Sequence, residues 1–160
     1  MAYFTLRPAE PADADAICRM HVDSIRRLDG PFYSAAQIEA WAGGKRPEQY
    51  LEPMALPGGR MLVALSAGQV AGYGIIHGPE IRGLYVSPDH VGMGVGRALC
   101  RAMEAWAAAQ GIPALHLMSS LQAEPFYLKM GFRRIEAARY RLGNGVELEA
   151  IRMEKFLGRP

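Results

Sequence analysis

Three alternating glycines near the middle of the chain, Gly92, Gly94 and Gly96, have the spacing of an anion-binding loop. They follow a run of strand-forming residues (84–86) and precede an amphipathic pattern of helical period that begins at Val95. The first N–H groups of a helix have no partners within the helix and lie at the positive end of its dipole. Because glycine has no side chain to cover them, a phosphate group can reach these N–H groups. The segment therefore predicts a phosphate-binding loop, with a tight strand-to-helix turn as the alternative.

The spacing of this loop excludes two common phosphate-binding motifs. A dinucleotide fingerprint requires Gly-x-Gly-x-x-Gly, whereas Arg97 stands where the third glycine would follow Gly92 and Gly94. A Walker loop requires Lys and then Ser or Thr after its last glycine, whereas Gly96 is followed by Arg97 and Ala98. Neither a Rossmann site nor a P-loop is therefore expected.

The loop instead resembles motif A of the GNAT N-acetyltransferase superfamily, in which Arg or Gln is followed by two residues, Gly, any residue, and Gly or Ala. Gly94 and Gly96 are the pattern glycines in this chain, and Gly92 is an additional one. The resemblance implies that the loop binds the pyrophosphate of acetyl-coenzyme A, mostly through backbone N–H groups. Val91 departs from the pattern at the Arg or Gln position, and binding through the backbone is expected to survive this departure.

A second segment resembles motif B of the same superfamily. Ser120, Ala123, Tyr127, Gly131 and Phe132 fall at its pattern positions with matching spacing. The resemblance implies that Tyr127 is the general acid that protonates the coenzyme A sulfur. A phenol near its ordinary pKa of about 10 is protonated at neutral pH, as this role requires. The alternative interpretation is an aromatic core residue on a helix.

Glu80 is the candidate base that takes a proton from the amine. Counted back from Gly94 without a gap, it falls where the histone-acetyltransferase branch of the superfamily has a glutamate, and a carboxylate there can accept a proton directly or through water. A solvated glutamate at the beginning of a strand is the alternative, and His77 and Tyr85 are lesser candidates for the base. Gly83, inside the same strand, predicts a bulge or a close backbone approach.

The resemblance to GNAT proteins implies a cofactor-binding set centred on the glycine loop and the strand before it. A bulge in that strand would separate it from its neighbour and free backbone groups for the thioester and the pantetheine arm. Arg97 is either a phosphate ligand or a solvated arginine, and Ser120 either bonds the pantetheine or caps the next helix. The full set is Leu84, Tyr85, Val86, Val91, Gly92, Met93, Gly94, Val95, Gly96, Arg97 and Ser120.

Strand and helix patterns predict a single α/β domain over residues 1–160. The resemblance specifies a mixed, mostly antiparallel central sheet flanked by helices. Strands are expected over residues 3–7, 61–66, 69–76, 80–86, 114–118, 132–140 and 146–153. Helices are expected from near Asp13 as N-cap, over 34–41 with a capping box at Ser34, from Val95 to about Gln110, and in the motif B segment. Residues 45–59, with three prolines, are expected to be the least regular.

Composition excludes several classes of protein. A chain of 160 residues buries about two-thirds of its unfolded surface and needs no disulfide to fold. The net charge of +2, with scattered Lys and Arg, argues against a nucleic-acid surface. Cys18 and Cys100 fall in helical patterns, which is typical of a reducing compartment. Since no apolar run is long enough to span a membrane and the first residues lack a secretory pattern, we expect a cytoplasmic protein without metal, nucleic-acid or membrane partners.

The main expectation is therefore an enzyme that transfers an acetyl group from acetyl-coenzyme A to the primary amine of a small molecule by direct attack. Three alternatives remain: a peptide or protein N-acetyltransferase, a non-catalytic acetyl-coenzyme A-binding module, and an interaction protein that keeps the fold without the ligand. A homodimer is left open. Acceptor pockets of the superfamily are formed by the first two helices and the loop after them, which here contain His21, Asp23, Phe32, Tyr33, Trp41 and Tyr50. These residues do not identify the acceptor.

Overall fold

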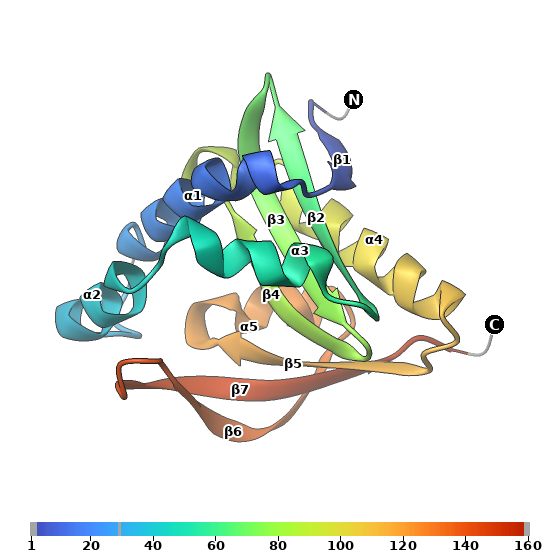
Figure 1. The fold of residues 1–160 in the computed structure, drawn as a ribbon. Helices are drawn as coiled ribbons and strands as arrows, with labels where there is room; N and C mark the ends of the chain where they lie inside the picture. The colour runs from blue at the N-terminus through green and yellow to red at the C-terminus, as the bar shows by residue number, and fades with distance from the viewer. Residues whose placement is uncertain (1–2, 29, 159–160) are drawn as a thin grey trace.

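The fold is built on one seven-stranded sheet with the strand order β1-β2-β3-β4-β5-β7-β6 (Figure 1). The computed structural model describes residues 3–28 and 30–158. Neighbouring strands are antiparallel except for β4 and β5, so the expected mixed, mostly antiparallel sheet is confirmed. The strands are β1 (Thr5–Pro8), β2 (Gly59–Ser66), β3 (Gln69–His77), β4 (Glu80–Val86), β5 (Ala114–Ser120), β6 (Arg133–Arg141) and β7 (Glu147–Phe156).

The sheet opens between its two parallel strands. Strands β4 and β5 are paired only at Glu80–His116 and Ile81–Leu117, beyond which they separate. Figure 1 shows the result, with β1–β4 running steeply and β5, β7 and β6 running across the base of the molecule. The register of β3 against β4 leaves Arg82 as an extra residue, because Ile81 and Gly83 pair with consecutive residues of β3. The predicted bulge at Gly83 is thus confirmed, and the edge of β4 beyond it is left without a neighbouring strand.

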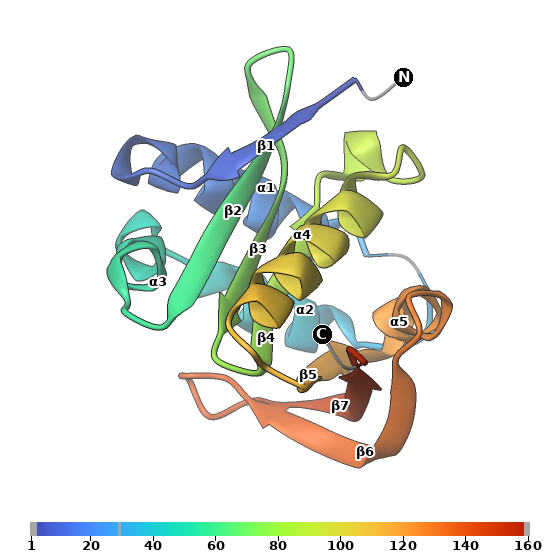
Figure 2. The same ribbon diagram turned by 90° about the vertical axis from the view of Figure 1, so that its right-hand side faces the viewer.

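Helices cover the two faces of the sheet unequally. Helices α1, α2 and α3 lie on one face, whereas α4 crosses the opposite face of β2–β4 (Figures 1 and 2). The short helix α5 follows β5 and lies beside the opening of the sheet (Figure 2). The helices are α1 (Ala14–Arg26), α2 (Ala35–Gly43), α3 (Leu51–Ala55), α4 (Val95–Ala109) and α5 (Glu124–Lys129), and the 3-10 helices are Pro11–Asp13, Pro47–Tyr50, Pro88–His90 and Leu121–Ala123. In the described part of the chain, no helix combines the length and the apolar character that crossing a membrane requires.

Local signals in the sequence gave the starts of α1, α2 and α4 correctly and missed two other features. The capping box at α2 is present, because the Ser34 hydroxyl accepts from the Gln37 N–H and the Gln37 side chain accepts from the Ser34 N–H. Asp13 does not cap α1 with its side chain. Its carboxylate instead accepts from the Glu10 N–H and from the Arg7 guanidinium at 2.7 Å, so it stabilises the preceding 3-10 turn. The segment 45–59 is more regular than expected, since it contains a 3-10 helix and α3.

Candidate active site

A cavity of about 470 Å³ lies where β4 and β5 separate. Its walls come from the end of β4, the glycine loop, the first turn of α4, the segment from Ser120 to α5, and the end of α1 at Ser24, Ile25 and Leu28. We call it the glycine-loop cavity. The two segments that resemble motifs A and B are 20 or more residues apart in the chain, and the splayed sheet brings them to the same cavity.

The glycine loop presents an open backbone surface to this cavity. Gly92 and Gly94 have φ values of 82° and 88°, in the left-handed region that favours glycine. A Cβ atom added to either residue would meet no heavy atom within 4 Å, so no side chain fills the space above them. Gly94 is the N-cap residue of α4, and among the described residues no backbone acceptor bonds the N–H groups of Val95, Gly96 or Arg97. This arrangement is suited to binding an anion such as a pyrophosphate.

Two buried polar atoms in the wall of the glycine-loop cavity also lack partners. Within the described residues, neither His90 Nδ1 nor Gln122 Oε1 makes a hydrogen bond. The Gln122 amide is otherwise held in place, because its Nε2 donates to Ser120 Oγ at 2.9 Å. A buried polar atom without a hydrogen bond costs free energy, so both atoms are suited to a ligand that carries polar groups along its length. The residues present therefore fit a long ligand with a phosphate end and an amide-containing arm.

The structure brings nearly all of the predicted cofactor-binding residues together. Ten of the eleven line the glycine-loop cavity, and the exception is Met93, whose side chain is exposed. Val95 contributes at the base of the loop, where its side chain is buried in the core. Sequence reasoning missed His90, Gln122 and Phe126 as wall residues. Phe126 had a local signal, since it directly precedes Tyr127, whereas His90 and Gln122 are placed by two 3-10 turns that the sequence did not predict.

Tyr127 both belongs to the core and lines the glycine-loop cavity. Its ring is 7% exposed and packs edge-on between Phe126 and Phe132, with ring centroids 5.1 and 5.6 Å away. Burial, with smaller contributions from Cys100 and Tyr85, raises the pKa of its phenol well above the ordinary value. Within the described residues its hydroxyl makes no hydrogen bond. The phenol is thus held protonated, as a general acid must be.

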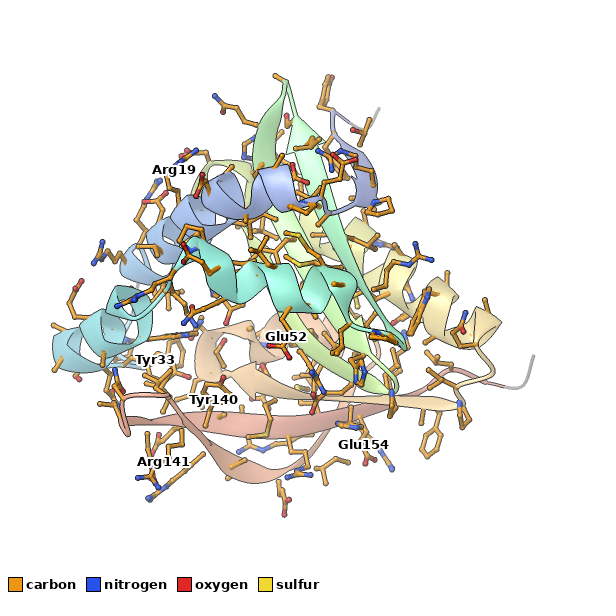
Figure 3. All side chains as sticks on the ribbon, in the orientation of Figure 1. Arg19, Tyr33, Glu52, Tyr140, Arg141 and Glu154 are labelled. Atoms are coloured by element: carbon orange, nitrogen blue, oxygen red, sulfur yellow. The ribbon has the colours of Figure 1, made fainter. Side chains whose placement is uncertain are left out.

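A second cavity, of about 220 Å³, adjoins the first and shares Tyr85 and Ser120 with it. We call it the aromatic cavity. Figure 3 labels two of its residues, Tyr33, which precedes α2, and Tyr140, which belongs to β6. Its aromatic residues are His21, Tyr33, Trp41, Tyr50, Tyr73, Tyr85 and Tyr140. Four residues expected from the sequence to form an acceptor pocket are among them, whereas Asp23 and Phe32 are not.

His21 is the centre of a buried hydrogen-bonded group in the wall of the aromatic cavity. Its Nδ1 lies 2.8 Å from the hydroxyl oxygens of both Tyr50 and Tyr73, and within the described residues its Nε2 has no partner. The pKa of His21 is lowered well below its ordinary value, mainly by burial and further by the nearby charge of Lys45. The imidazole is therefore neutral at physiological pH.

Glu80, the candidate base, lies outside the walls of both cavities. Its Oε1 accepts from Arg82 Nε at 2.7 Å, and the Arg82 side chain lines the aromatic cavity. The same guanidinium also contacts His77, whose Nδ1 lies 3.2 Å from Arg82 Nη2. Glu80 therefore does not line the aromatic cavity, and its link to that cavity is the hydrogen bond with Arg82.

Two adjoining cavities therefore lie at the opening of a mixed α/β sheet, one with a glycine loop and a buried phenol and the other lined by aromatic rings. Comparison with known proteins assigns the chain to a family. The model of the acetyltransferase (GNAT) domain family matches residues 30–157, so the chain belongs to the GNAT acetyltransferases. Membership implies acetyl transfer from acetyl-coenzyme A as the class of reaction.

Solved structures agree with this assignment. The chain is 33% identical to a GCN5-related N-acetyltransferase from Rhodopseudomonas palustris, with a TM-score of 0.89 over 98% of this chain and 97% of that one. The PaiA N-acetyltransferase from Thermoplasma acidophilum, solved in complex with coenzyme A, is 20% identical, with a TM-score of 0.77 over 96% and 98% of the two chains. The ribosomal-protein-alanine N-acetyltransferase from Brucella melitensis is 20% identical, with a TM-score of 0.70 over 95% and 99%. The last two establish similarity of fold alone. No curated protein matches the chain significantly.

Proposed function

We propose that this protein transfers the acetyl group of acetyl-coenzyme A to the primary amine of a small molecule, by direct attack, with Tyr127 as the general acid. One observation carries the proposal: the glycine-loop cavity, with its open cradle and its protonated phenol, meets the aromatic cavity at Tyr85 and Ser120. Two ligands can therefore meet beside the free edge of β4. The volume of the aromatic cavity, about 220 Å³, favours a small acceptor over an extended peptide.

The chain's own residues supply what such a transfer needs. A neutral amine nitrogen attacks the thioester carbonyl, the new C–N bond forms, and the C–S bond breaks. Backbone N–H groups at the edge of β4, beyond its bulge, can polarise the carbonyl as it becomes tetrahedral. The hydroxyl of Tyr127 gives its proton to the departing sulfur. The attacking nitrogen loses one proton, and Tyr127 takes a proton back from solvent, so the products are the amide and the free thiol and the enzyme is restored.

Two groups are candidates to accept the proton that the nitrogen loses. The sequence suggests Glu80 as the base, by position in the strand. The contact between Glu80 and Arg82 instead supports a positioning role for this carboxylate, with water as the proton acceptor. Substitution of Glu80 by glutamine separates the two roles, because a base acts on turnover and a positioning residue acts on amine binding.

Free cysteines support a cytoplasmic site of action as part of the proposal. Cys18 and Cys100 are both buried and unlinked. This usage is typical of proteins in reducing compartments.

The function is tested with acetyl-coenzyme A binding and thiol release in the wild type and in Tyr127→Phe. Acetyl-coenzyme A is expected to raise the melting temperature of both proteins, since a ligand that binds only the folded state stabilises it. Thiol release with an amine panel is expected to fall at least roughly 100-fold in Tyr127→Phe, the usual effect of losing a general acid. Tyr3→Phe, which removes the hydroxyl from an exposed tyrosine, is the matched control. An unshifted melting temperature in the wild type would reject the function, and full turnover in Tyr127→Phe would reject the acid.

A further inference from the structure

We propose that the aromatic cavity takes an acceptor amine that also carries a carboxylate, as amino acids do, and that Lys45 and Arg82 bind this carboxylate. The inference rests on the proposed acetyl transfer and adds the chemical class of the acceptor. It is carried by the charges in the wall of the cavity.

Lys45 is a cation without a counter-charge in the part of the chain that the structure describes. Its side chain follows α2, lines the aromatic cavity and is partly buried. Among residues 3–28 and 30–158, no carboxylate lies within ion-pair distance of its ammonium group, and no hydrogen-bond acceptor engages it. Burial accordingly lowers the pKa of Lys45. Removing a cation from water without a partner costs free energy, and a bound anion would offset this cost.

Arg82 places a second cation in the same wall. Its Nε is held by Glu80 at 2.7 Å and its Nη2 faces His77, which fixes the plane of the guanidinium. Its Nη1 makes no hydrogen bond within the described residues, so this end is available to a ligand. A planar guanidinium recognises the two oxygens of a carboxylate well.

Among the described residues, Lys45 is the cation of this wall that stays unpaired, since Arg82 has Glu80 as its partner. Glu149, on β7, is the one acidic residue that the wall contains within the described chain; it is exposed and forms no ion pair with Lys45. His21 is neutral, because burial and Lys45 lower its pKa. The unpaired ammonium of Lys45 disfavours a polyamine, which would bring like charges together, and favours an amine with its own negative group. The aromatic rings suit an apolar or aromatic side chain.

The direct test compares amino acids with the amines left when their carboxylate is removed. The probes are phenylalanine with phenethylamine, tyrosine with tyramine, and leucine with isoamylamine, with spermidine as a polycation and ethanolamine phosphate as an alternative anion. Binding to the protein saturated with coenzyme A is measured by calorimetry, and thiol release from acetyl-coenzyme A is measured in parallel. We expect the amino acid of at least one pair to bind at least roughly tenfold more tightly than its amine, the value of one charge-assisted hydrogen bond.

Variants at Lys45 show whether this residue carries the preference. Lys45→Met keeps the length of the side chain and removes the charge, whereas Lys45→Arg keeps the charge. The preference for the carboxylate is expected to be lost in Lys45→Met, through a higher KM for the amino acid, and largely kept in Lys45→Arg. Lys129→Met, which removes an exposed lysine outside both cavities, is the matched control. The acetyl-coenzyme A melting shift, retained in every variant, confirms that each one folds.

The outcomes separate the inference from the function on which it rests. If acetyl-coenzyme A stabilises the protein but amino acids bind no better than their amines, or spermidine or ethanolamine phosphate binds best, the inference is overturned and the acetyltransferase stands. If Lys45→Met keeps the full preference, the role of Lys45 is overturned. If acetyl-coenzyme A fails to bind while amino acids still bind in preference to amines, the proposed function fails and the anion site remains.

Discussion

Tyr127 combines a reactive hydroxyl with an apolar environment. Its ring packs between two phenylalanines, and its side chain lines the glycine-loop cavity. The hydroxyl is the one polar group of this side chain. Desolvation favours the neutral phenol over the phenolate and therefore raises its pKa. The packing that makes Tyr127 a core residue thus also keeps it ready to donate a proton.

The raised pKa of Tyr127 predicts the pH dependence of catalysis. An acid whose pKa is raised keeps its proton to higher pH, so it does not limit the rate in the alkaline range. The attacking amine, by contrast, becomes reactive as it loses its proton. We expect kcat at saturating amine to rise with pH and to show no descending limb below about pH 10, the ordinary pKa of a phenol. Lys45, whose pKa is lowered by burial, acts on amine binding and therefore on KM, so kcat is the quantity that reports on Tyr127. A descending limb between pH 7 and 9, absent from the stability of the protein over the same range, would contradict this role for Tyr127.

Glu80 offers a second test at the level of single residues. Because its carboxylate holds Arg82 at 2.7 Å and lies outside both cavities, Glu80→Gln is expected to raise the KM for the amine severalfold while kcat stays within about threefold. A catalytic base would behave differently, since its loss usually lowers turnover by roughly 100-fold or more. Steady-state kinetics with the amine varied at saturating acetyl-coenzyme A separate the two results. Glu52→Gln, on α3 and also outside both cavities, is the matched control.

At the level of elements, the junction of β4 and α4 forms the glycine loop and exposes the first N–H groups of α4. The strand ends at Val86, a 3-10 turn follows, and the left-handed glycines turn the chain so that the first N–H groups of α4 face the opening of the sheet. Gly94 is the critical position, because it is the N-cap of α4 and has a φ of 88°. A side chain there would strain the backbone and enter the space above the loop.

Comparison of Gly94→Ala with Gly68→Ala distinguishes backbone strain from an effect on acetyl-coenzyme A binding. Both glycines have a positive φ, and a Cβ at either would meet no atom within 4 Å, but Gly68 lies in the β2–β3 turn, outside the glycine-loop cavity. Each substitution is expected to lower the free energy of unfolding by about 1 kcal/mol, the cost of a left-handed backbone in a residue with a side chain. Only Gly94→Ala is expected to weaken acetyl-coenzyme A binding, measured by calorimetry. Equal affinity in the two variants would show that the loop does not hold the phosphates.

At the level of the whole molecule, one buried ion pair joins parts that are distant in the sequence. Glu104 of α4 accepts from Lys155 of β7 at 2.7 Å, and the same ammonium donates to the carbonyl of Met130 at 2.6 Å, after α5. The two side chains are 10% and 16% exposed. The contact therefore connects α4, the end of α5 and the sheet behind the glycine-loop cavity.

Removal of this carboxylate is expected to destabilise the fold. Glu104→Ala leaves Lys155 buried without its counter-charge, which typically costs about 3 kcal/mol. Arg101 also contacts Glu104, at 3.1 Å, but its side chain is 51% exposed, so Arg101→Ala is expected to cost less than about 1 kcal/mol. Urea denaturation of the two variants measures the difference. Equal stability of Glu104→Ala and the wild type would show that the pair contributes nothing to the fold.

Local features of the sequence determined the strands, most of the helices and the glycine loop. Each depends on neighbouring residues: the alternation of apolar side chains in the strands, the Ser34 capping box, and the glycines that permit a left-handed backbone. Gly83 likewise predicted the bulge of β4 from its own lack of a side chain. The resemblance of two motifs to GNAT proteins then gave the family and ten wall residues of the glycine-loop cavity.

Only the tertiary structure decided which distant residues share a site or a charge. In the helical period of α4, Glu104 shares a face with Arg97 and Arg101, but Lys155, 51 positions away, allows it to be buried. Lys45, after α2, and Arg82, on β4, line one cavity, whereas Glu80 lies outside it, because helix and strand segments far apart in the chain pack together there. Periodicity and spacing predict how a residue is placed within its own helix or strand. Burial, charge pairing and the shape of a cavity depend on elements that pack together after the chain has folded.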